Sequence, residues 1–528
     1  MDAANAESTA PVSMKRTLTL TGVTVNAMAL IAPGAFLWTT FAEQSALSAG
    51  SHSTAPAMWP GLLLALILAM FTAYSYAELA RIYPGAGTGS SYYFAEAAFL
   101  DKEKKRHRRY ARLAKLSFGW ISHLYYWIYP GIMVAFGATL VGYIYQTITG
   151  GHALGFLPLA AIAVLFAGGV GYIAYRGITG STNVAVIINV VQITALVAFG
   201  VFAIVFRLSH PHLAGGYAHP SGFGGVIIPH NLLSVLYQST IAILLVVGFE
   251  SATALGAEAR NPERDVKRGV MLSLIIQGAI CYLFEYLAAN YVIGGGTIST
   301  GSGKSYVGGY AAAANASAPI GDMVTKMGNM TFGHGVGVVL ALIMAATVLL
   351  ALVGTTLACL NTGVRVTYAM AREKEMPSLL SFLHGKFATP YASIWVLTGI
   401  SALLGIYGLK SVNTLTQITL ASNTGTFLVY GMTCLVALIA FAGRADRHPI
   451  KHSVIPGLGL VMNLAEFVGV VYLAVKAGGS SSLDAYVALG IVAAWVVAGA
   501  IWVKVNPRMR GVKVLDDHST ASKVSLPA

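Results

Sequence analysis

Charged residues are scarce in this 528-residue chain. Asp, Glu, Lys and Arg together make up 10% of it, whereas hydrophobic residues make up 56%. A soluble globular domain carries about 25% charged residues, so the composition excludes a soluble protein. Cysteine is also rare. The three cysteines, Cys281, Cys359 and Cys434, all lie within apolar stretches, which argues against disulfides and against a zinc site.

The signatures of enzymes and of nucleotide-driven pumps are also lacking. There is no Walker sequence, the histidines are not spaced as metal ligands, and no soluble-enzyme motif occurs. We therefore expect neither an enzyme nor a protein that holds a cofactor or metal. A cleavable signal peptide is not expected either, because the apolar stretch after Lys15 and Arg16 is too long and contains its own Pro-Gly break.

Long apolar stretches are what the chain does have. About twelve of them reach the roughly 20 residues that cross a hydrocarbon core as a helix. They lack the alternating pattern of membrane β-strands, so we expect an all-α membrane protein of about twelve transmembrane helices. The stretches cover residues 20–41, 59–82, 117–147, 157–176, 184–207, 232–256, 270–293, 332–371, 391–409, 414–442, 456–476 and 484–504.

The basic residues are distributed unevenly along this pattern. The net charge is +13, but only five of the 33 Lys and Arg residues fall in external loops if the N-terminus is inside. This asymmetry predicts cytoplasmic termini and accounts for the charge without a nucleic-acid partner. The densest basic run, residues 102–115, is expected at the lipid headgroups, as a topology anchor or as a specific anionic-lipid or regulatory site. The five external residues are Arg207, Lys304, Lys326, Lys410 and Lys476.

Two of the stretches contain helix-breaking residues. The first has Pro33-Gly34, and the sixth has Gly248 two residues before Glu250. A proline removes a backbone donor and a glycine tolerates non-helical geometry. The two interruptions lie five spans apart, and an odd offset inverts the second half in the membrane. Matched breaks in inverted halves point to the midplane site of a secondary transporter.

Glu250 strengthens that interpretation, because a carboxylate at bilayer depth is costly unless it faces a cavity, a partner or a proton. The alternative is a packing glycine with a carboxylate that pairs with a neighbouring helix.

Several segments resemble the amino acid–polyamine–organocation superfamily, and the resemblance covers nearly the whole chain. It rests on the first-span break, the second-span exit YAELARIYPGAG, the sixth-span VGFESA with its exit ARNPERDVKRG, and the eighth-span end RVTYAMAR. It implies a five-plus-five inverted-repeat core with discontinuous helices 1 and 6. The implied division is a tail at 1–17, a transport core at 18–442, two peripheral helices at 443–504 and a tail at 505–528.

The resemblance also implies a binding site at the two breaks, where family members hold the carboxylate and amine of the substrate on backbone groups. A half-helix that begins near Ala35 would point free N–H groups at an anion, and Glu250 would favour a cation. The substrate-binding candidates are Ala32, Pro33, Gly34, Ala35, Leu244, Val247, Gly248, Phe249 and Glu250.

The chain departs from the family pattern at three positions. Ala32-Pro33-Gly34 replaces the usual Gly-Ser-Gly, so one amide that would bind a carboxylate is missing, as in putrescine importers of the superfamily. Leu244 stands where arginine/agmatine antiporters have an aromatic gate. Gln192 stands where many proton-linked members have a lysine, and a neutral amide cannot release a proton.

Other polar residues inside the spans give further candidates. Proton coupling is assigned to Glu250, Gln192, His123 or Glu285, and a possible sodium ion to Thr355 and Thr356. Threonine hydroxyls in membrane helices usually bond their own backbone instead. Glu466, like Glu285, is either a proton carrier or a neutral or paired structural group. Glu78 is expected to pair with Arg81, and Tyr125, Tyr126 and Trp127 are expected to form an interfacial aromatic belt rather than a cation cage.

These features predict a secondary active transporter that moves a small amine-bearing solute, an amino acid or a polyamine, by alternating access. We expect proton coupling and a bacterial plasma-membrane location, with lipids as the surrounding partner. A sodium-coupled or exchanging amino-acid carrier, a channel, and a non-transporting sensor or scaffold remain as alternatives. The Gly/Ala/Ser-rich external segment 294–331 is either a short lid or a connector, and its composition favours the connector.

Overall fold

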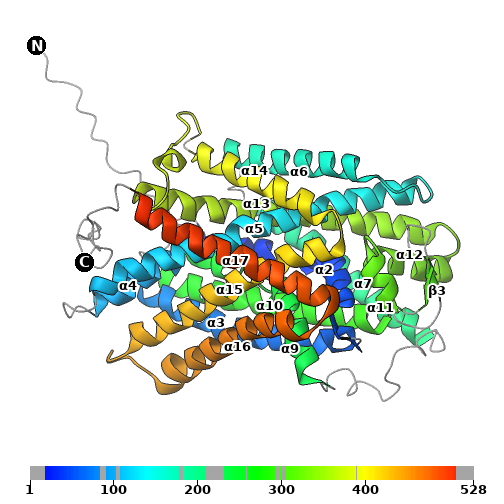
Figure 1. The fold of residues 1–528 in the computed structure, drawn as a ribbon. Helices are drawn as coiled ribbons and strands as arrows, with labels where there is room; N and C mark the ends of the chain where they lie inside the picture. The colour runs from blue at the N-terminus through cyan, green and yellow to red at the C-terminus, as the bar shows by residue number, and fades with distance from the viewer. Residues whose placement is uncertain are drawn as a thin grey trace, which may run out of the picture.

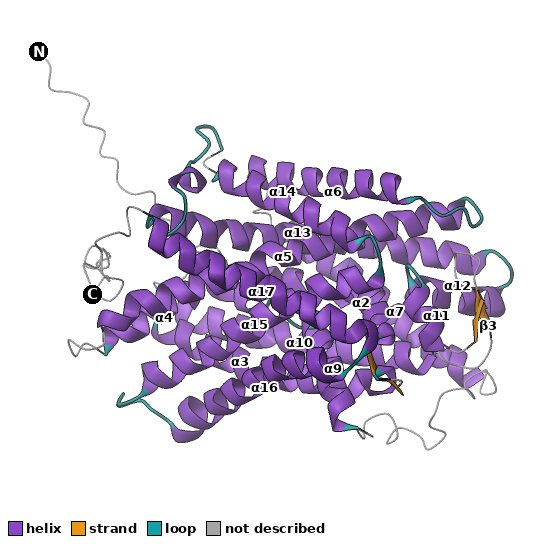
Figure 2. Cartoon of the chain, viewed as in Figure 1, coloured by secondary structure: helices purple, strands orange, loops and turns teal. Residues whose placement is uncertain are grey.

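The computed structural model shows an almost wholly helical molecule in the residues that it describes (Figure 2). Its strands form two short antiparallel hairpins, one pairing Ser48–Ala49 with His52–Ser53 and the other pairing Thr297–Ser299 with Ser305–Val307. These results confirm the predicted all-α class. The described residues are 18–31, 33–50, 52–83, 91–102, 108–177, 182–209, 231–256, 259–291, 297–299, 305–307, 309–387 and 389–506.

The first predicted span consists of two helices, α1 (Leu20–Ile31) and α2 (Pro33–Ala46). A proline cannot continue a helix, because it lacks the N–H and its ring clashes with the preceding turn, but it is well suited to begin one. Ala32, between the two helices, lies outside the described residues. The other elements of the first half are β1 (Ser48–Ala49), β2 (His52–Ser53), η1 (Ala55–Ala57), α3 (Met58–Ile82), α4 (Ser91–Asp101), α5 (Arg108–Ile148), α6 (Phe156–Arg176) and α7 (Thr182–Ser209).

The sixth span is also discontinuous. The helix α9 (Leu232–Ala242) tightens into a 3-10 turn, η4 (Ile243–Leu245), and the chain resumes as the 3-10 helix η5 (Phe249–Leu255). Between them Gly248 has φ +118°, a conformation that other residues rarely adopt. The elements that follow are α10 (Pro262–Tyr291), β3 (Thr297–Ser299), β4 (Ser305–Val307), α11 (Gly309–Asn315), α12 (Pro319–Phe332), α13 (Val336–Arg372), η6 (Ser378–Ser381), α14 (Tyr391–Gly408), α15 (Val412–Phe441), η7 (Ile450–Val454), α16 (Ile455–Lys476) and α17 (Gly479–Val505).

The packing of the helices shows the inverted repeat. In the first half the five spans are α1/α2, α3, α5, α6 and α7; in the second they are α9/η5, α10, α13, α14 and α15. Exchanging the halves maps observed contacts onto observed contacts: α1 packs on α10 as α9 packs on α3, α2 on α10 as η5 on α3, and α7 on α13 as α15 on α5. The first broken span therefore packs on α10 and the sixth on α3, and α3 and α10 also pack on each other.

The remaining two spans lie at the periphery of this core. The helices α16 and α17 pack on each other and on α15. Nine helices of the described residues are long and apolar enough to cross a membrane, and α1 and the α9–η4 segment are shorter apolar helices. Together with α10, which has 30 residues, they account for the twelve stretches predicted from the sequence.

The segment 294–331 is more than the connector that its composition favours. Its described residues form the β3–β4 hairpin and the helices α11 and α12, which pack on α2, and α12 also packs on α13. The helix α4 occupies the corresponding place in the first half, between the second and third spans, and packs on α5. Figure 1 shows α4 at one end of the bundle and α12 at the other, as an inverted repeat requires.

Candidate transport site

The two breaks lie against each other. A Cβ atom added to Gly248 would come within 2.9 Å of the Leu30 side chain and 3.1 Å of the Leu30 carbonyl carbon. Only a glycine allows the sixth span to approach the end of α1 this closely, because the neighbouring atoms include backbone that cannot move aside. The close contact places the backbone of the sixth-span break against the last turn of α1.

Glu250 lies in this region and is only 1% exposed. Its Oε2 accepts a hydrogen bond from the Gly248 N–H at 3.0 Å and another from the Tyr430 hydroxyl at 2.7 Å. Its Oε1 makes no hydrogen bond, and the Tyr125 hydroxyl, which is also unbonded, lies beside the carboxylate. These neighbours are all neutral. A buried carboxylate with neutral partners is able to hold a proton or to meet a cation.

Aromatic side chains surround the carboxylate. The Phe249 ring packs on Tyr76 of α3 and Tyr430 of α15, with ring centroids 6.1 and 5.3 Å away. Tyr125 and Tyr126 of α5 are buried as well. The prediction that these two tyrosines belong to an interfacial belt is therefore wrong: the 3.6-residue period turns them inward, whereas the sequence shows only that they lie near the start of a span.

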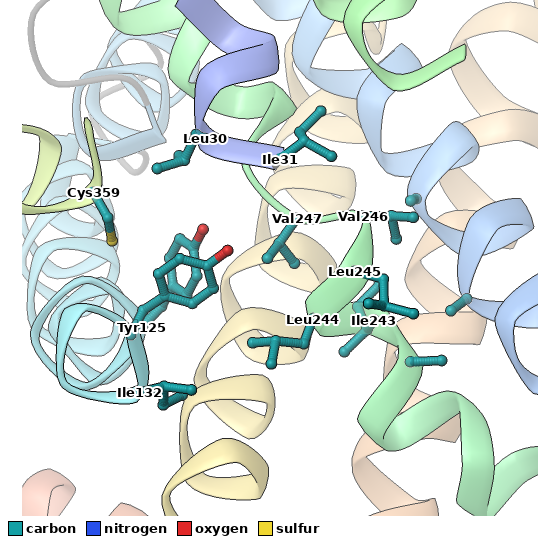
Figure 3. Close-up of a cluster of buried hydrophobic side chains, with 14 of the residues drawn as sticks. Leu30, Ile31, Tyr125, Ile132, Ile243, Leu244, Leu245, Val246, Val247 and Cys359 are labelled. Atoms are coloured by element: carbon teal, nitrogen blue, oxygen red, sulfur yellow. The ribbon is translucent and has the colours of Figure 1, made fainter. Parts of the chain in front are cut away.

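An apolar wall completes the region. Leu30, Ile31, Leu244 and Val247 are all fully buried. Figure 3 shows Tyr125 reaching from α5 toward Val247, with Leu30 and Cys359 nearby. Because residue 244 is a leucine, the site has no aromatic gate at this position. The described residues at both breaks are closed to solvent in this conformation.

The residues at the first break are described in part. Ala32 lies outside the described residues, as do the side chains of Pro33 and Ala35, although both residues belong to α2. Gly34 is buried, and a Cβ added to it would lie 3.3 Å from Nε2 of Gln192. The Gln192 Nε2 itself is buried and makes no hydrogen bond. The structure thus brings Gln192 of the fifth span to the first break.

The two threonines of α13 differ in their contacts. Thr355 donates to the carbonyl of Ala29 at 2.9 Å, which links α13 to the last turn of α1. Thr356 donates to the carbonyl of Leu352 at 2.6 Å, within its own helix. Only Thr355 therefore contacts the broken helix, and its oxygen keeps lone pairs that could serve a cation.

His123, another candidate for proton coupling, makes its described contacts away from Glu250. The two ring nitrogens of His123 contact the Gly119 carbonyl and the Thr367 hydroxyl, the latter at 3.1 Å, and its ring packs on Trp127. Glu285 belongs to α10, but its side chain lies outside the described residues. Glu466 of α16 accepts a hydrogen bond from Ser239 of α9 at 2.5 Å.

An ion-pair cluster closes the bundle at the end of α3. Arg81 contacts Glu78 at 2.8 Å, which confirms the predicted pair, and Lys267 of α10 contacts the other oxygen of Glu78. His452 lies 3.4 Å from the same carboxylate. The cluster joins α3 to α10, the second span of each half. These ion pairs therefore link the first half of the repeat to the second half at one end of the bundle.

Sequence reasoning missed Tyr430, Tyr76 and Cys359 as neighbours of the site. Tyr430 lies in the middle of α15, and the nearest signal is an unremarkable Val-Tyr-Gly sequence. Nothing local distinguishes it from a lipid-facing tyrosine. The packing of α15 on α5 and α3 brings it to Glu250, 180 positions earlier in the chain.

A twelve-span inverted repeat with two adjacent helix breaks around a buried carboxylate defines a secondary transporter. The sequence profile of the amino acid permease family matches residues 16–499, and the chain belongs to that family. It is a secondary transporter of amine-bearing solutes, which confirms the class of function expected from the sequence.

Relatives with known names agree with this assignment. A branched-chain amino acid permease of Bacillus subtilis is 25% identical over 460 residues, which cover 85% of each chain. The low-affinity putrescine importer PlaP of Escherichia coli is 24% identical over 497 residues, 94% of each chain. The crystal structure of MhsT with L-phenylalanine has a TM-score of 0.53 at 12% identity and covers 86% of this chain and 99% of its own. At this identity the likeness to MhsT shows the fold alone.

Proposed function

We propose that this chain is a proton-coupled carrier of a small amine, with the two helix breaks as its binding site. The observation that carries the proposal is Glu250, a fully buried carboxylate with only neutral partners beside the break at Gly248. In the proposed cycle Glu250 binds the ammonium group of the solute when ionised and is protonated when the solute is absent. The proton and the solute then compete for one carboxylate, which links their movements.

The first break supports an amine over an ordinary α-amino acid. Pro33 begins α2 without an N–H, so the half-helix offers one fewer donor to a carboxylate. The relative named as a putrescine importer is consistent with a solute that has no carboxylate. We therefore assign the first-break backbone to the side of the site that binds a carboxylate weakly. It comprises Ala32, Pro33, Gly34 and Ala35. Val247, Gly248, Phe249 and Glu250 form its cation-binding side.

A neutral amino acid with an apolar side chain is the second candidate. Leu30, Leu244 and Val247 would face such a side chain, and one relative is named a branched-chain amino acid permease. In that case Thr355, which bonds the end of α1, would be the place for a sodium ion in a sodium-coupled carrier, with Thr356 as its neighbour.

We further propose a plasma-membrane location, a transport core at residues 18–442 and a peripheral pair of helices at residues 443–504.

The test is uptake into proteoliposomes that carry either a proton gradient or a sodium gradient. Putrescine and leucine serve as the two radiolabelled solutes. Because the proton and the solute compete for Glu250, they should exchange: we expect putrescine to enter the proteoliposomes as protons leave, and uptake to stop when an uncoupler is added. Glu250→Gln is expected to weaken solute binding at least tenfold, because a charge-assisted contact is lost, and to flatten the pH dependence of uptake.

Glu466→Gln is the matched control, since it removes a second buried carboxylate that contacts Ser239 of α9 and not the break. It should keep the pH dependence. Uptake driven by sodium, insensitive to the uncoupler and unchanged in pH dependence by Glu250→Gln, would reject the proposal in favour of the second candidate.

A further inference from the structure

A second pair of acidic side chains lies in a small pocket away from the helix breaks. Glu43 belongs to α2, close to its C-terminal end, and Asp484 belongs to the first turns of α17. The pocket between them is also lined by the start of α15, including Asn413 and Thr416, and by Ser481 of α17. It therefore joins the half-helix α2 to the repeat core and to a peripheral helix.

Glu43 is the feature that points to a ligand. Its side chain is fully buried and lines the pocket, and neither of its carboxyl oxygens makes a hydrogen bond. The neighbouring hydroxyl of Thr419 is also unbonded. Asp484, which lines the same pocket, carries a charge of the same sign. A buried carboxylate without partners is costly, so a bound group that supplies positive charge would stabilise it.

The polar groups around the pocket provide hydrogen-bond acceptors, whereas most of their donors are already used. The amide groups of Asn413 and Gln417 already donate to the two oxygens of Asp484, at 2.9 and 2.8 Å. The Thr416 hydroxyl donates to the carbonyl of Val412 at 2.9 Å, which leaves its lone pairs free. Ser481 accepts from the backbone N–H of Ser48 at 3.0 Å. Such a donor-poor set of oxygens suits a hard cation and not an anion.

The size of the pocket limits the ligand further. The space open to the centre of a water molecule is about 10 Å³, room for one water or one monatomic ion. This enclosed space is too small for a magnesium ion that keeps several of its waters. Asp484 already accepts from two amide donors, so Glu43 is the one carboxylate of the pair without a partner, which matches the single charge of a sodium-sized ion.

We propose that Glu43 and Asp484 hold a small monovalent cation that ties α2 to α15 and α17. Because α2 is one half of the broken first span, the ion would fix the position of that half-helix while the other elements of the site move. The site is separate from Glu250 and from Thr355, and the proposal holds for any transported solute.

The test compares thermal unfolding of the purified protein in sodium chloride and in N-methyl-D-glucamine chloride at equal ionic strength and pH 8. The wild type should show a saturable rise in Tm with sodium and bind about one ²²Na⁺ ion per chain at this site. Glu43→Gln and Asp484→Asn should each weaken the sodium response on the order of 10- to 100-fold. Two variants are used because either one could fold poorly, and the sodium-dependent difference, not Tm itself, is the readout.

Glu466→Gln serves as the control, because it neutralises a buried carboxylate on α16 outside this pocket. It should keep the full sodium response. A wild-type Tm equal in the two salts would overturn the proposal, and so would an unchanged sodium response in both Glu43→Gln and Asp484→Asn. A Tm that responds to pH and not to sodium, with that response lost in Glu43→Gln, would assign a proton to Glu43 and also overturn it. Solute-dependent shifts in Tm, measured alongside, report on the helix-break site independently.

Discussion

Gly248 combines two constraints that no other residue type meets. Its φ of +118° is costly for any residue with a Cβ atom, and that atom would lie 2.9 Å from Leu30. The same residue donates its N–H to Glu250. The glycine therefore determines both how close the two breaks come and where the carboxylate lies.

Gly248→Ala is expected to destabilise the protein by roughly 1–3 kcal/mol and to reduce uptake sharply, because the added methyl group separates the breaks. The measurement is Tm of the purified variant together with uptake in proteoliposomes. Gly457→Ala in α16 is the control, since a Cβ there meets no atom within 4 Å. It should leave both readouts near wild type. Normal uptake by Gly248→Ala would contradict the role of the close contact.

Gly34 presents a weaker constraint than Gly248. An added Cβ would lie 3.3 Å from the end of the Gln192 side chain, which is able to shift. An alanine at position 34 should therefore be tolerated, whereas the larger Gly34→Leu should abolish uptake with little loss of membrane expression. The ratio of uptake to expressed protein distinguishes the two variants. A transporting Gly34→Leu variant would show that the first break does not contact the solute.

The helices α4, α5 and α13 meet in a polar junction at the end of the bundle that carries α4. Lys115 of α5 contacts Glu96 and Glu373, both at 2.6 Å. Tyr92 of α4 donates to Glu373 at 2.9 Å and to Glu375 at 2.8 Å. Burial raises the pKa of Glu375 from 4.5 to about 7, although the hydrogen bond from Tyr92 and the charge of Lys115 oppose the rise.

This pKa predicts how the stability of the protein changes with pH. The folded state binds more protons than the unfolded state between about pH 4.5 and 7, so stability should fall as the pH rises through this range. Glu375→Gln should remove that fall and stabilise the protein at pH 8, by about 3 kcal/mol at most. Tm measured from pH 5 to 8 provides the test.

Glu373→Gln is the contrasting variant for the same junction. It breaks the ion pair with Lys115 and should lower Tm at pH 8, where Glu375→Gln raises it. Equal pH profiles for the wild type and Glu375→Gln would show that this carboxyl does not titrate in the range.

At the scale of the whole molecule, the inverted repeat determines which loops lie at opposite ends of the bundle. Lys386 follows α13, and Lys326 lies in α12, so the inverted repeat places them at opposite ends of the bundle. Cys281, Cys359 and Cys434 are buried, which leaves a cysteine introduced at the surface as the reactive one. If the termini are cytoplasmic, Lys326→Cys should react with a membrane-impermeant maleimide in intact cells and Lys386→Cys only after the membrane is opened. Labelling of both from outside would reject the proposed topology.

The class of the molecule follows from local features of the sequence. The lengths of the apolar stretches predict the spans, because a helix must cross a hydrocarbon core of known thickness. Pro33 and Gly248 predict the breaks, because proline and glycine change the backbone at their own positions. Which residues gather around Glu250 was decided by the tertiary structure. Tyr430 and Tyr125 come from spans far away in the chain, and their inward direction depends on how α5 and α15 pack. The same holds for Glu43 and Asp484, 441 positions apart, since no local pattern encodes which helix ends will meet.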